Sequence, residues 1–243
     1  MIQQRAGNAK NLVYSSLRTS ILGLNLVPGA VIGEKDISLR FNVSRTPVRE
    51  AFIALSKEGL VTVMPQKGSM VSRIDLTRIE QELFLRESLE TAALKLFLKT
   101  CDSSHLAELE KYIELQAEAA DARKYELFLQ YDNQFHRIFF NGQNVAWEAL
   151  ENMCGHYHRI RLLSIWLQDI VKDVIEEHKQ LFQAVKQKDS LIAMALLNVH
   201  LHKLVAEEAL LKRLFPDYFA DSSEAFTVDF GGLDIMDINR EQK

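Results

Sequence analysis

The chain has 243 residues, of which 47% are hydrophobic and 26% charged, with only 10 glycines and 4 prolines. This composition is ordinary for globular proteins and excludes a chain that is disordered throughout. No run reaches the roughly 18 apolar residues needed to span a bilayer, so we expect a cytoplasmic protein without a membrane partner. Cys101 and Cys154 each lie alone in helix-like sequence, which excludes a disulfide framework and a Cys-x-x-Cys motif.

Charge is distributed unevenly along the chain. The net charge is −4, yet residues 1–75 carry ten Lys and Arg against five Asp and Glu, whereas residues 76–243 carry 19 against 28. A basic segment can bind nucleic acid, because neutralised phosphates release condensed counterions. The break in charge near residue 75 therefore indicates a basic N-terminal domain followed by an acidic body.

The first 75 residues contain the patterns of three short helices and a hairpin. Apolar residues recur at helical spacing over residues 10–24 and 34–41. A third helix begins after Ser44, a candidate N-cap, with Pro47 in its first turn. Two β-prone runs follow at residues 60–64 and 69–73. Together these elements predict a winged helix-turn-helix domain.

The third helix presents two arginines in its N-terminal half. Arg45 and Arg49 are four residues apart, so they share the face opposite the apolar stripe that contains Val48 and Phe52. In a recognition helix this position faces base edges, and Arg suits guanine or phosphate. A merely solvated charged face is the alternative. Arg45, Arg49 and the neighbouring Thr46 are therefore candidate DNA-binding residues.

A longer stretch resembles the DNA-binding domain of the GntR family of bacterial regulators. The matching segments are residues 26–29 (LVPG), 32–34 (IGE), 41–61 (FNVSRTPVREAFIALSKEGLV) and 65–68 (PQKG). The resemblance implies a homodimer that reads two half-sites of double-stranded operator DNA. It further implies operator contacts from Arg45, Thr46 and Arg49, phosphate contact from Lys35, and minor-groove contact from Lys67 and Gly68. Many relatives carry Arg in place of Lys35, and Lys lacks the bidentate fork of Arg.

Beyond residue 75 the pattern is entirely helical, which predicts an all-α domain over residues 76–213. Six helices are expected, at residues 77–99, 103–121, 123–140, 144–167, 170–187 and 189–212. Asn144 and Asp189 are candidate N-caps. From Leu214 onward seven acidic residues, two basic ones and Gly231-Gly232 predict an acidic tail, residues 214–243, with weak order.

Metal-competent side chains lie on the apolar stripes of three of these helices. Asp132 and His136 are four residues apart and share a face with phenylalanines, and His178 and His200 each lie in an apolar row. A single such histidine is commonly an ordinary core residue, but four inward polar groups favour a metal site. One carboxylate with three imidazoles suits zinc, nickel, iron or manganese.

These helices resemble the FCD-type effector domain of the FadR subfamily of GntR regulators, an antiparallel helical bundle. The signature lies in residues 131–140 (YDNQFHRIFF), 176–189 (EEHKQLFQAVKQKD) and His200. The resemblance covers about residues 76–205. It implies a divalent metal ion, with zinc the preferred candidate, bound by Asp132, His136, His178 and His200. His202 is a weaker candidate ligand, and His156 and His158 are surface or pocket-lining candidates.

Effectors of this family are often carboxylates, which implies a basic partner in the pocket. Arg86 is the first candidate, followed by Arg159 and Arg161, of which only one is expected to face inward because they are two residues apart. Arg86 could instead form an ordinary ion pair with Glu90, four residues later.

Three functions follow from these patterns. The first is a ligand-responsive transcriptional regulator, not an enzyme, in which effector binding changes operator affinity. A metalloenzyme is the second, because such a site could activate water, but the chain has no Glu-x-x-His pair, His-Glu-x-x-His motif or glycine-rich phosphate loop. A regulator with a purely structural metal site is the third. The sequence does not identify the effector, the metal, the operator or the direction of regulation.

Overall fold

The computed structural model describes residues 2–64, 68–166, 169–203, 208–220 and 226–227. The chain divides into two compact units: Met1–Leu76 together with Lys212–Lys243, and Thr77–Leu211. The sequence predicts a separate tail over residues 214–243, and the described residues of that stretch, 214–220 and 226–227, group with the N-terminal unit. No helix among the described residues is long and apolar enough to cross a membrane.

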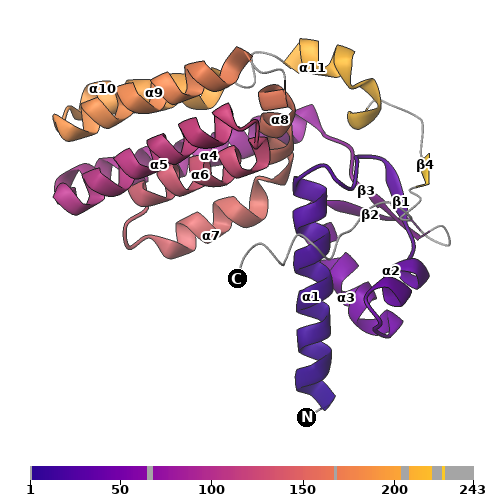
Figure 1. Cartoon of the computed structure of the whole chain (residues 1–243). Coiled ribbons are helices and arrows are strands. Elements are labelled where there is room, and N and C mark those ends of the chain that lie inside the picture. Colours follow the sequence, from indigo (N-terminus) through magenta and orange to yellow (C-terminus); the bar gives the residue numbers. More distant parts are fainter. Residues whose placement is uncertain (1, 65–67, 167–168, 204–207, 221–225, 228–243) are drawn as a thin grey trace. The chain divides into compact units, whose positions relative to one another are not determined.

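The N-terminal unit is a winged helix-turn-helix, which confirms the predicted fold of this part (Figure 1). Its elements are α1 (Ile2–Leu22), β1 (Ala30–Ile32), α2 (Glu34–Arg40), α3 (Arg45–Lys57), β2 (Val61–Met64), β3 (Gly68–Val71), η1 (Pro216–Tyr218) and β4 (Phe226–Thr227). Helix α1 begins well before the predicted residue 10. Ser44 directly precedes α3, but its hydroxyl makes no capping hydrogen bond, contrary to the expectation from sequence.

The core of this unit forms where α1 packs against α3. The contributing side chains are fully or almost fully buried, and include Leu17 and Ile21 of α1 and Phe52 and Leu55 of α3. Burying each such side chain contributes about 1.5–3 kcal/mol relative to leaving it exposed. This packing fixes α3 by its apolar stripe and leaves the opposite face, with Arg45 and Arg49, free for solvent.

A four-stranded sheet in the order β2-β3-β1-β4 completes the unit. Strands β2 and β3 form the predicted hairpin, and β1 pairs antiparallel with β3. Strand β1 was not predicted, because three residues are too few to show a period-2 pattern. Gly68 opens β3 at φ +93°, where a Cβ atom would lie 3.3 Å from the carbonyl oxygen of Ile32, so both conformation and space favour glycine. Lys67 lies outside the described residues.

Residues 215–220, here called the return segment, dock on the end of the winged helix. The backbone N–H of Ile74 donates to the carbonyl of Tyr218 at 2.7 Å, and that of Ala220 donates to the carbonyl of Ile74 at 3.0 Å. Phe219 is 1% exposed. The prediction of weak order from Leu214 onward is therefore wrong for residues 214–220, because a buried aromatic side chain and two backbone hydrogen bonds hold them. Strand β4 adds a parallel pairing with β1.

The second unit is the predicted all-α antiparallel bundle (Figure 1). Its helices are α4 (Leu76–Thr100), α5 (Ser103–Asp121), α6 (Tyr125–Phe139), α7 (Asn144–Met153), α8 (Gly155–Trp166), α9 (Asp169–Lys186) and α10 (Ser190–Lys203). Helix α11 (Glu208–Leu214) contains the boundary between the two units, which falls after Leu211. Helix α5 packs against α6 and α9, and α9 packs against α10. Asp189 accepts from the backbone N–H of Ile192 at 3.0 Å, the capping interaction expected at the start of α10.

The single helix predicted over residues 144–167 is two helices, interrupted at Cys154 (φ −105°, ψ +39°). Glu82 of α4 explains how the second helix can begin there: its Oε2 accepts from the backbone N–H of Tyr157 at 2.8 Å. A side chain from another helix thus satisfies an N–H of the first turn of α8. Of the helix predicted over 189–212, the described residues form α10 to Lys203 and α11 from Glu208, and residues 204–207 lie outside the described part of the chain. Gln143, rather than Asn144, is the N-cap of α7.

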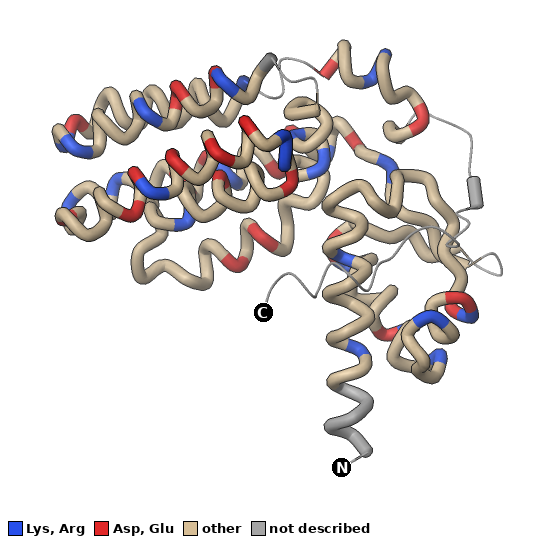
Figure 2. Tube along the Cα trace, viewed as in Figure 1, with Lys and Arg blue, Asp and Glu red and all other residues tan. Residues whose placement is uncertain are grey.

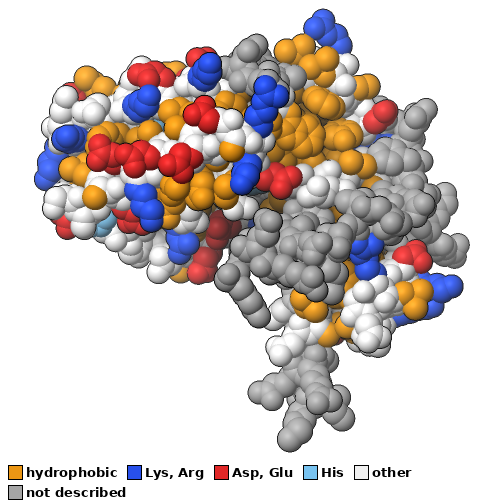
Figure 3. Space-filling view, viewed as in Figure 1, with side chains coloured by type: hydrophobic (Ala, Val, Ile, Leu, Met, Phe, Trp, Pro, Cys, Tyr) orange, Lys and Arg blue, Asp and Glu red, His pale blue; other side chains and the backbone are white. Residues whose placement is uncertain are grey.

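The bundle surface mixes charges of both signs with apolar side chains. Lys, Arg, Asp and Glu are interspersed along its helices (Figure 2). The space-filling view shows hydrophobic side chains exposed between them (Figure 3). Large apolar residues exposed on this unit include Phe84, Val145, Leu191 and Val199.

Candidate functional site

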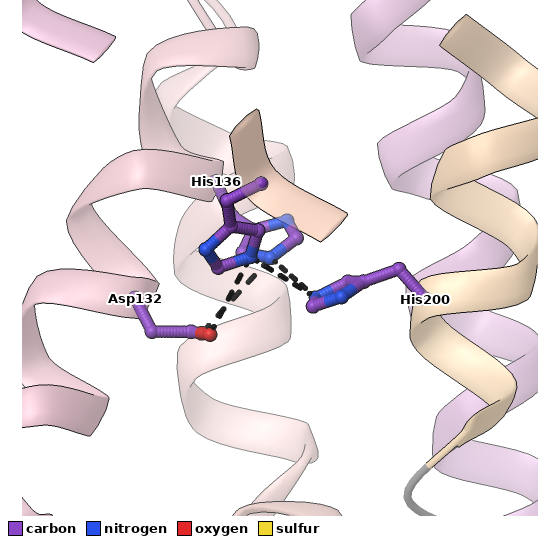
Figure 4. Close-up of side chains that lie close together, drawn as sticks. Asp132, His136 and His200 are labelled. Atoms are coloured by element: carbon purple, nitrogen blue, oxygen red, sulfur yellow. Dashed lines mark hydrogen bonds and ion pairs between the residues drawn. The ribbon is translucent and has the colours of Figure 1, made fainter. Parts of the chain in front are cut away.

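The bundle brings together the four metal-competent residues that the sequence analysis selected. Helix α6 supplies Asp132 and His136 from one face, α9 supplies His178, and α10 supplies His200. All four are buried, and one ligand atom of each lies within 4.8 Å of those of the others. The Nε2 atom of His200 lies 3.1 Å from Nε2 of His136 and 3.2 Å from Nε2 of His178. Figure 4 shows Asp132, His136 and His200 pointing toward one another from their helices.

Asp132 closes the cluster on one side. Its Oδ1 lies 3.7 Å from Nε2 of His178, and its Oδ2 lies 4.0 Å from Nε2 of His136. Oδ2 also accepts a short hydrogen bond from the Arg161 guanidinium, which donates to Oδ1 of Asn133 at 3.0 Å as well. Asp132 is thus held by a buried cation while it faces the imidazoles.

Each imidazole has an acceptor at its other nitrogen. Nδ1 of His136 lies 2.6 Å from Glu90 Oε2, Nδ1 of His178 lies 2.6 Å from Gln116 Oε1, and Nδ1 of His200 lies 2.9 Å from Glu177 Oε2. An acceptor at Nδ1 places the ring proton there and leaves the Nε2 lone pair free, the arrangement found around metal-binding histidines.

The cluster fits a small cation. Three Nε2 lone pairs and a carboxylate that face one another repel unless a cation or a proton lies between them. In a tetrahedral site with Zn–N distances near 2.0 Å, neighbouring nitrogens are about 3.3 Å apart, close to the 3.1 and 3.2 Å between the Nε2 atoms here. The donor set therefore could hold a divalent metal ion.

The protonation states of these side chains at neutral pH also favour metal binding. Burial lowers the pKa of His136 and lowers that of His178 well below its ordinary value, so both rings stay neutral. Burial alone would raise the pKa of Asp132, but the positive charge of the adjacent Arg161 guanidinium, the largest opposing cause, holds it far below its usual range. His136 and His178 therefore present neutral imidazoles and Asp132 an ionised carboxylate, the forms that bind metal.

The three candidate effector-binding arginines are all buried in the bundle. Arg161 contacts Asp132 of the cluster directly, whereas Arg86 donates to Glu90, which in turn contacts His136. Their guanidinium carbons lie 5.7 and 5.2 Å from the centre of the Tyr157 ring. Arg159 donates instead to the carbonyl of Gly155 in its own helix, and burial lowers its pKa to about 10. Only one of Arg159 and Arg161 was expected to face inward. This expectation is wrong, because both side chains are buried.

Several residues around the cluster were not selected from sequence. Gln116 and Glu177 were missed, and Glu90 was considered only as an ion-pair partner. Gln116 follows Leu109 and Ile113 on the buried face of α5, so a polar residue in that apolar row was a usable signal. His202 is exposed and contacts Asn198 and Glu87. His156 is buried, and His158 is half-buried.

In the N-terminal unit the candidate DNA-binding side chains are at the surface. Arg45, Thr46 and Arg49 of α3 and Lys35 of α2 are exposed. Lysines and arginines of these two helices lie close to acidic residues (Figure 2). Gly68 is half-buried at the start of β3.

A winged helix-turn-helix joined to a helical bundle with a buried polar centre defines the chain as a DNA-binding transcriptional regulator. Residues 9–71 match the bacterial regulatory proteins of the gntR family, and residues 82–203 match the FCD domain. The chain therefore belongs to the GntR family, with an FCD domain as its second part, and is a regulator and not an enzyme.

Relatives and solved structures agree with this assignment. A regulator from an unstable DNA locus of Streptomyces ambofaciens is 31% identical over 230 residues, which cover 94% of this chain and 96% of that protein. The HTH-type transcriptional repressor RspR of Escherichia coli K12 is 28% identical over 211 residues, covering 86% and 92%. The solved structure of E. coli McbR/YncC has the same fold, with a TM-score of 0.70 at 21% identity over 85% of this chain and 98% of that one.

Proposed function

We propose that this regulator binds a divalent metal ion, zinc first among the candidates, through Asp132, His136, His178 and His200. The observation that carries the proposal is the convergence of three Nε2 atoms and one carboxylate, with an acceptor behind every ring. When bound, the metal would supply a Lewis-acidic centre for an effector oxygen. Nickel, iron and manganese suit the same donor set.

The effector is a small carboxylate, because the site needs an anion once the metal is bound. The negative charges of Asp132 and Glu90 are already neutralised by Arg161 and Arg86. A divalent ion therefore adds two uncompensated positive charges to this buried region. Buried charge without a counter-ion is costly, and an anionic ligand offsets it. Arg86, Arg159 and Arg161 are the basic side chains proposed to meet that ligand. A relative in Bacillus subtilis, 24% identical over 194 residues, is named the gluconate operon transcriptional repressor, and gluconate is a hydroxycarboxylate.

The exposed face of α3 reads operator DNA. Arg45, Thr46 and Arg49 enter the major groove, Lys35 contacts phosphate, and Lys67 and Gly68 of the wing approach the minor groove. A homodimer of the FadR type, located in the cytoplasm with its operator, places two such heads on half-sites related by two-fold symmetry. Exposed apolar side chains on the bundle, such as Phe84 and Leu191, are compatible with a subunit interface.

Thermal unfolding with metal analysis tests the sensing site. Full-length protein is stripped with EDTA, reloaded with each metal in turn, and melted with mono-, di- and tricarboxylates and sugar acids. A ligand of the native state raises the melting temperature by mass action, so we expect a carboxylate shift only in the metal-loaded protein. His178→Ala should abolish it, whereas His202→Ala, the matched control on an exposed ring, should retain it.

Other outcomes would change the proposal. A shift with metal but with no carboxylate would assign the metal a structural role only. An equal carboxylate shift in stripped and loaded protein would separate the effector from the metal. Operator affinity that is unchanged by a carboxylate which does shift melting would contradict the regulatory role of that ligand.

A further inference from the structure

An ion pair between α2 and α3 engages one of the proposed DNA-reading arginines. Nε of Arg49 donates to Oε1 of Glu34 at 3.0 Å, and Nη2 of Arg49 donates to Oε2 at 2.9 Å. The two hydrogen bonds are parallel and use one side of the guanidinium, from Nε to Nη2. Glu34 is the first residue of α2, and Arg49 lies in the first half of α3.

Stability is a poor explanation for this pair. The Arg49 side chain is 66% exposed and that of Glu34 is 29% exposed. Exposed ion pairs contribute little to folding, because water screens the charges and both side chains lose freedom. The hydrogen bond from Arg49, followed by the nearby charges of Arg49 and Arg45, lowers the pKa of Glu34, so the carboxylate is ionised at neutral pH.

The geometry leaves the other edge of the guanidinium intact. Arginine has five N–H groups, of which this pair occupies the one on Nε and one on Nη2. The end-on edge still carries one outward N–H on Nη1 and one on Nη2. Two parallel donors of this kind match O6 and N7 of guanine in the major groove. An arginine without such a partner can turn either edge toward a base or a phosphate.

We propose that Glu34 is a positioning residue for operator recognition, which holds Arg49 so that its end-on edge reads one guanine. The carboxylate also places a negative charge beside Arg45 and Arg49, which opposes docking of these arginines on phosphates in other registers. Glu34 therefore raises selectivity for the operator over other DNA. This inference rests on the proposed placement of α3 in the major groove.

The test is base preference, measured with the full-length protein. A pool of random-sequence duplexes is enriched on the wild-type chain, and affinities are then measured for the enriched duplex and all its single-base-pair variants. The variants of the protein are Glu34→Gln, Glu34→Asp, Arg49→Gln and Glu50→Gln. Glu50 is exposed on α3 next to Arg49, so its substitution removes the same charge without touching the ion pair.

We expect Glu34→Gln to lower the preference for one G·C pair by roughly tenfold, within the range of a bidentate arginine–guanine contact. Arg49→Gln should lose preference at that same base pair. Glu34→Asp keeps a carboxylate and should retain part of the preference, and Glu50→Gln should retain all of it. Unchanged melting temperatures would show that the variants are folded.

Two results would overturn the inference. If Glu34→Gln keeps full base preference while Arg49→Gln loses it, α3 reads the operator but Glu34 does not position Arg49. If Glu34→Gln tightens binding equally to every duplex, the carboxylate acts through its charge alone. Full preference in Arg49→Gln would instead contradict the proposed DNA-binding surface itself.

Discussion

The carboxylate of Glu90 on α4 lies 2.6 Å from Nδ1 of His136 on α6, and its second oxygen accepts from Arg86. Burial by itself would raise the pKa of Glu90, but Arg86 and then His136 lower it to about 2. One ionised side chain therefore orients a ring of the cluster and neutralises a buried guanidinium.

Glu90→Gln should destabilise the protein strongly. The substitution leaves the buried charge of Arg86 without its partner, a change that typically costs about 3–5 kcal/mol. Chemical denaturation measures the loss. Glu87→Gln, a half-exposed position on the same helix, is the control and should change the unfolding free energy little. Similar stability of the two variants would show that the Arg86–Glu90 pair does not compensate a buried charge.

Glu177→Ala should weaken metal binding by about 10- to 100-fold, the usual effect of removing a carboxylate behind a metal-binding histidine. The reason is that Oε2 of Glu177 holds Nδ1 of His200 at 2.9 Å. Competition with a chelator of known affinity measures the change. The adjacent Glu176→Ala is a matched control, because Glu176 is 60% exposed and pairs only with Lys179 at 3.5 Å among the contacts described. Equal affinities in the two variants would contradict the prediction.

Phe219→Ala should destabilise the winged-helix unit by about 3 kcal/mol, the lower end of the range for core phenylalanines. Phe219 is 1% exposed where the return segment docks on Ile74. Phe215→Ala makes the same substitution at a half-buried site and should cost clearly less. The comparison uses denaturant unfolding of the full chain. If both variants lose the same free energy of unfolding, the deeper burial of Phe219 adds no stability beyond that of a half-buried phenylalanine.

Neither cysteine should react with a thiol reagent in the folded protein. Burial, followed by the nearby charge of Glu82, raises the pKa of Cys154 to about 12, and burial raises that of Cys101 as well. The thiolate is the reactive form, so modification at about pH 8 should be slow until denaturant is added, and then involve both thiols. Rapid labelling of one cysteine under native conditions would show that its side chain is accessible.

The sequence was informative where a pattern is local. Asp132 and His136 share a helix face because they are four residues apart, and His178 and His200 interrupt apolar rows, so their inward direction followed from helical periodicity. The winged helix followed in the same way from short helices and a hairpin. Each of these inferences needed only neighbouring residues.

What the sequence could not reveal depends on contacts between distant segments. Glu90 contacts the imidazole of His136, 46 residues away, and Gln116 contacts that of His178, 62 residues away. The break at Cys154 depends partly on Glu82, which contacts α8 at a position 75 residues later. Strand β1 exists because of its neighbours in the sheet, and no periodicity over three residues could have indicated it.

The parallel pairing of β1 with β4 also has a consequence for the order of synthesis. Ala30 pairs with Phe226, so one edge of the N-terminal sheet consists of residues that follow the whole helical bundle in the sequence. During translation the α1–α3 core and the β2–β3 hairpin can form early, because their contacts are local. The outer edge of that sheet, by contrast, closes only after Phe226 and Thr227 have been synthesised, long after the rest of the sheet.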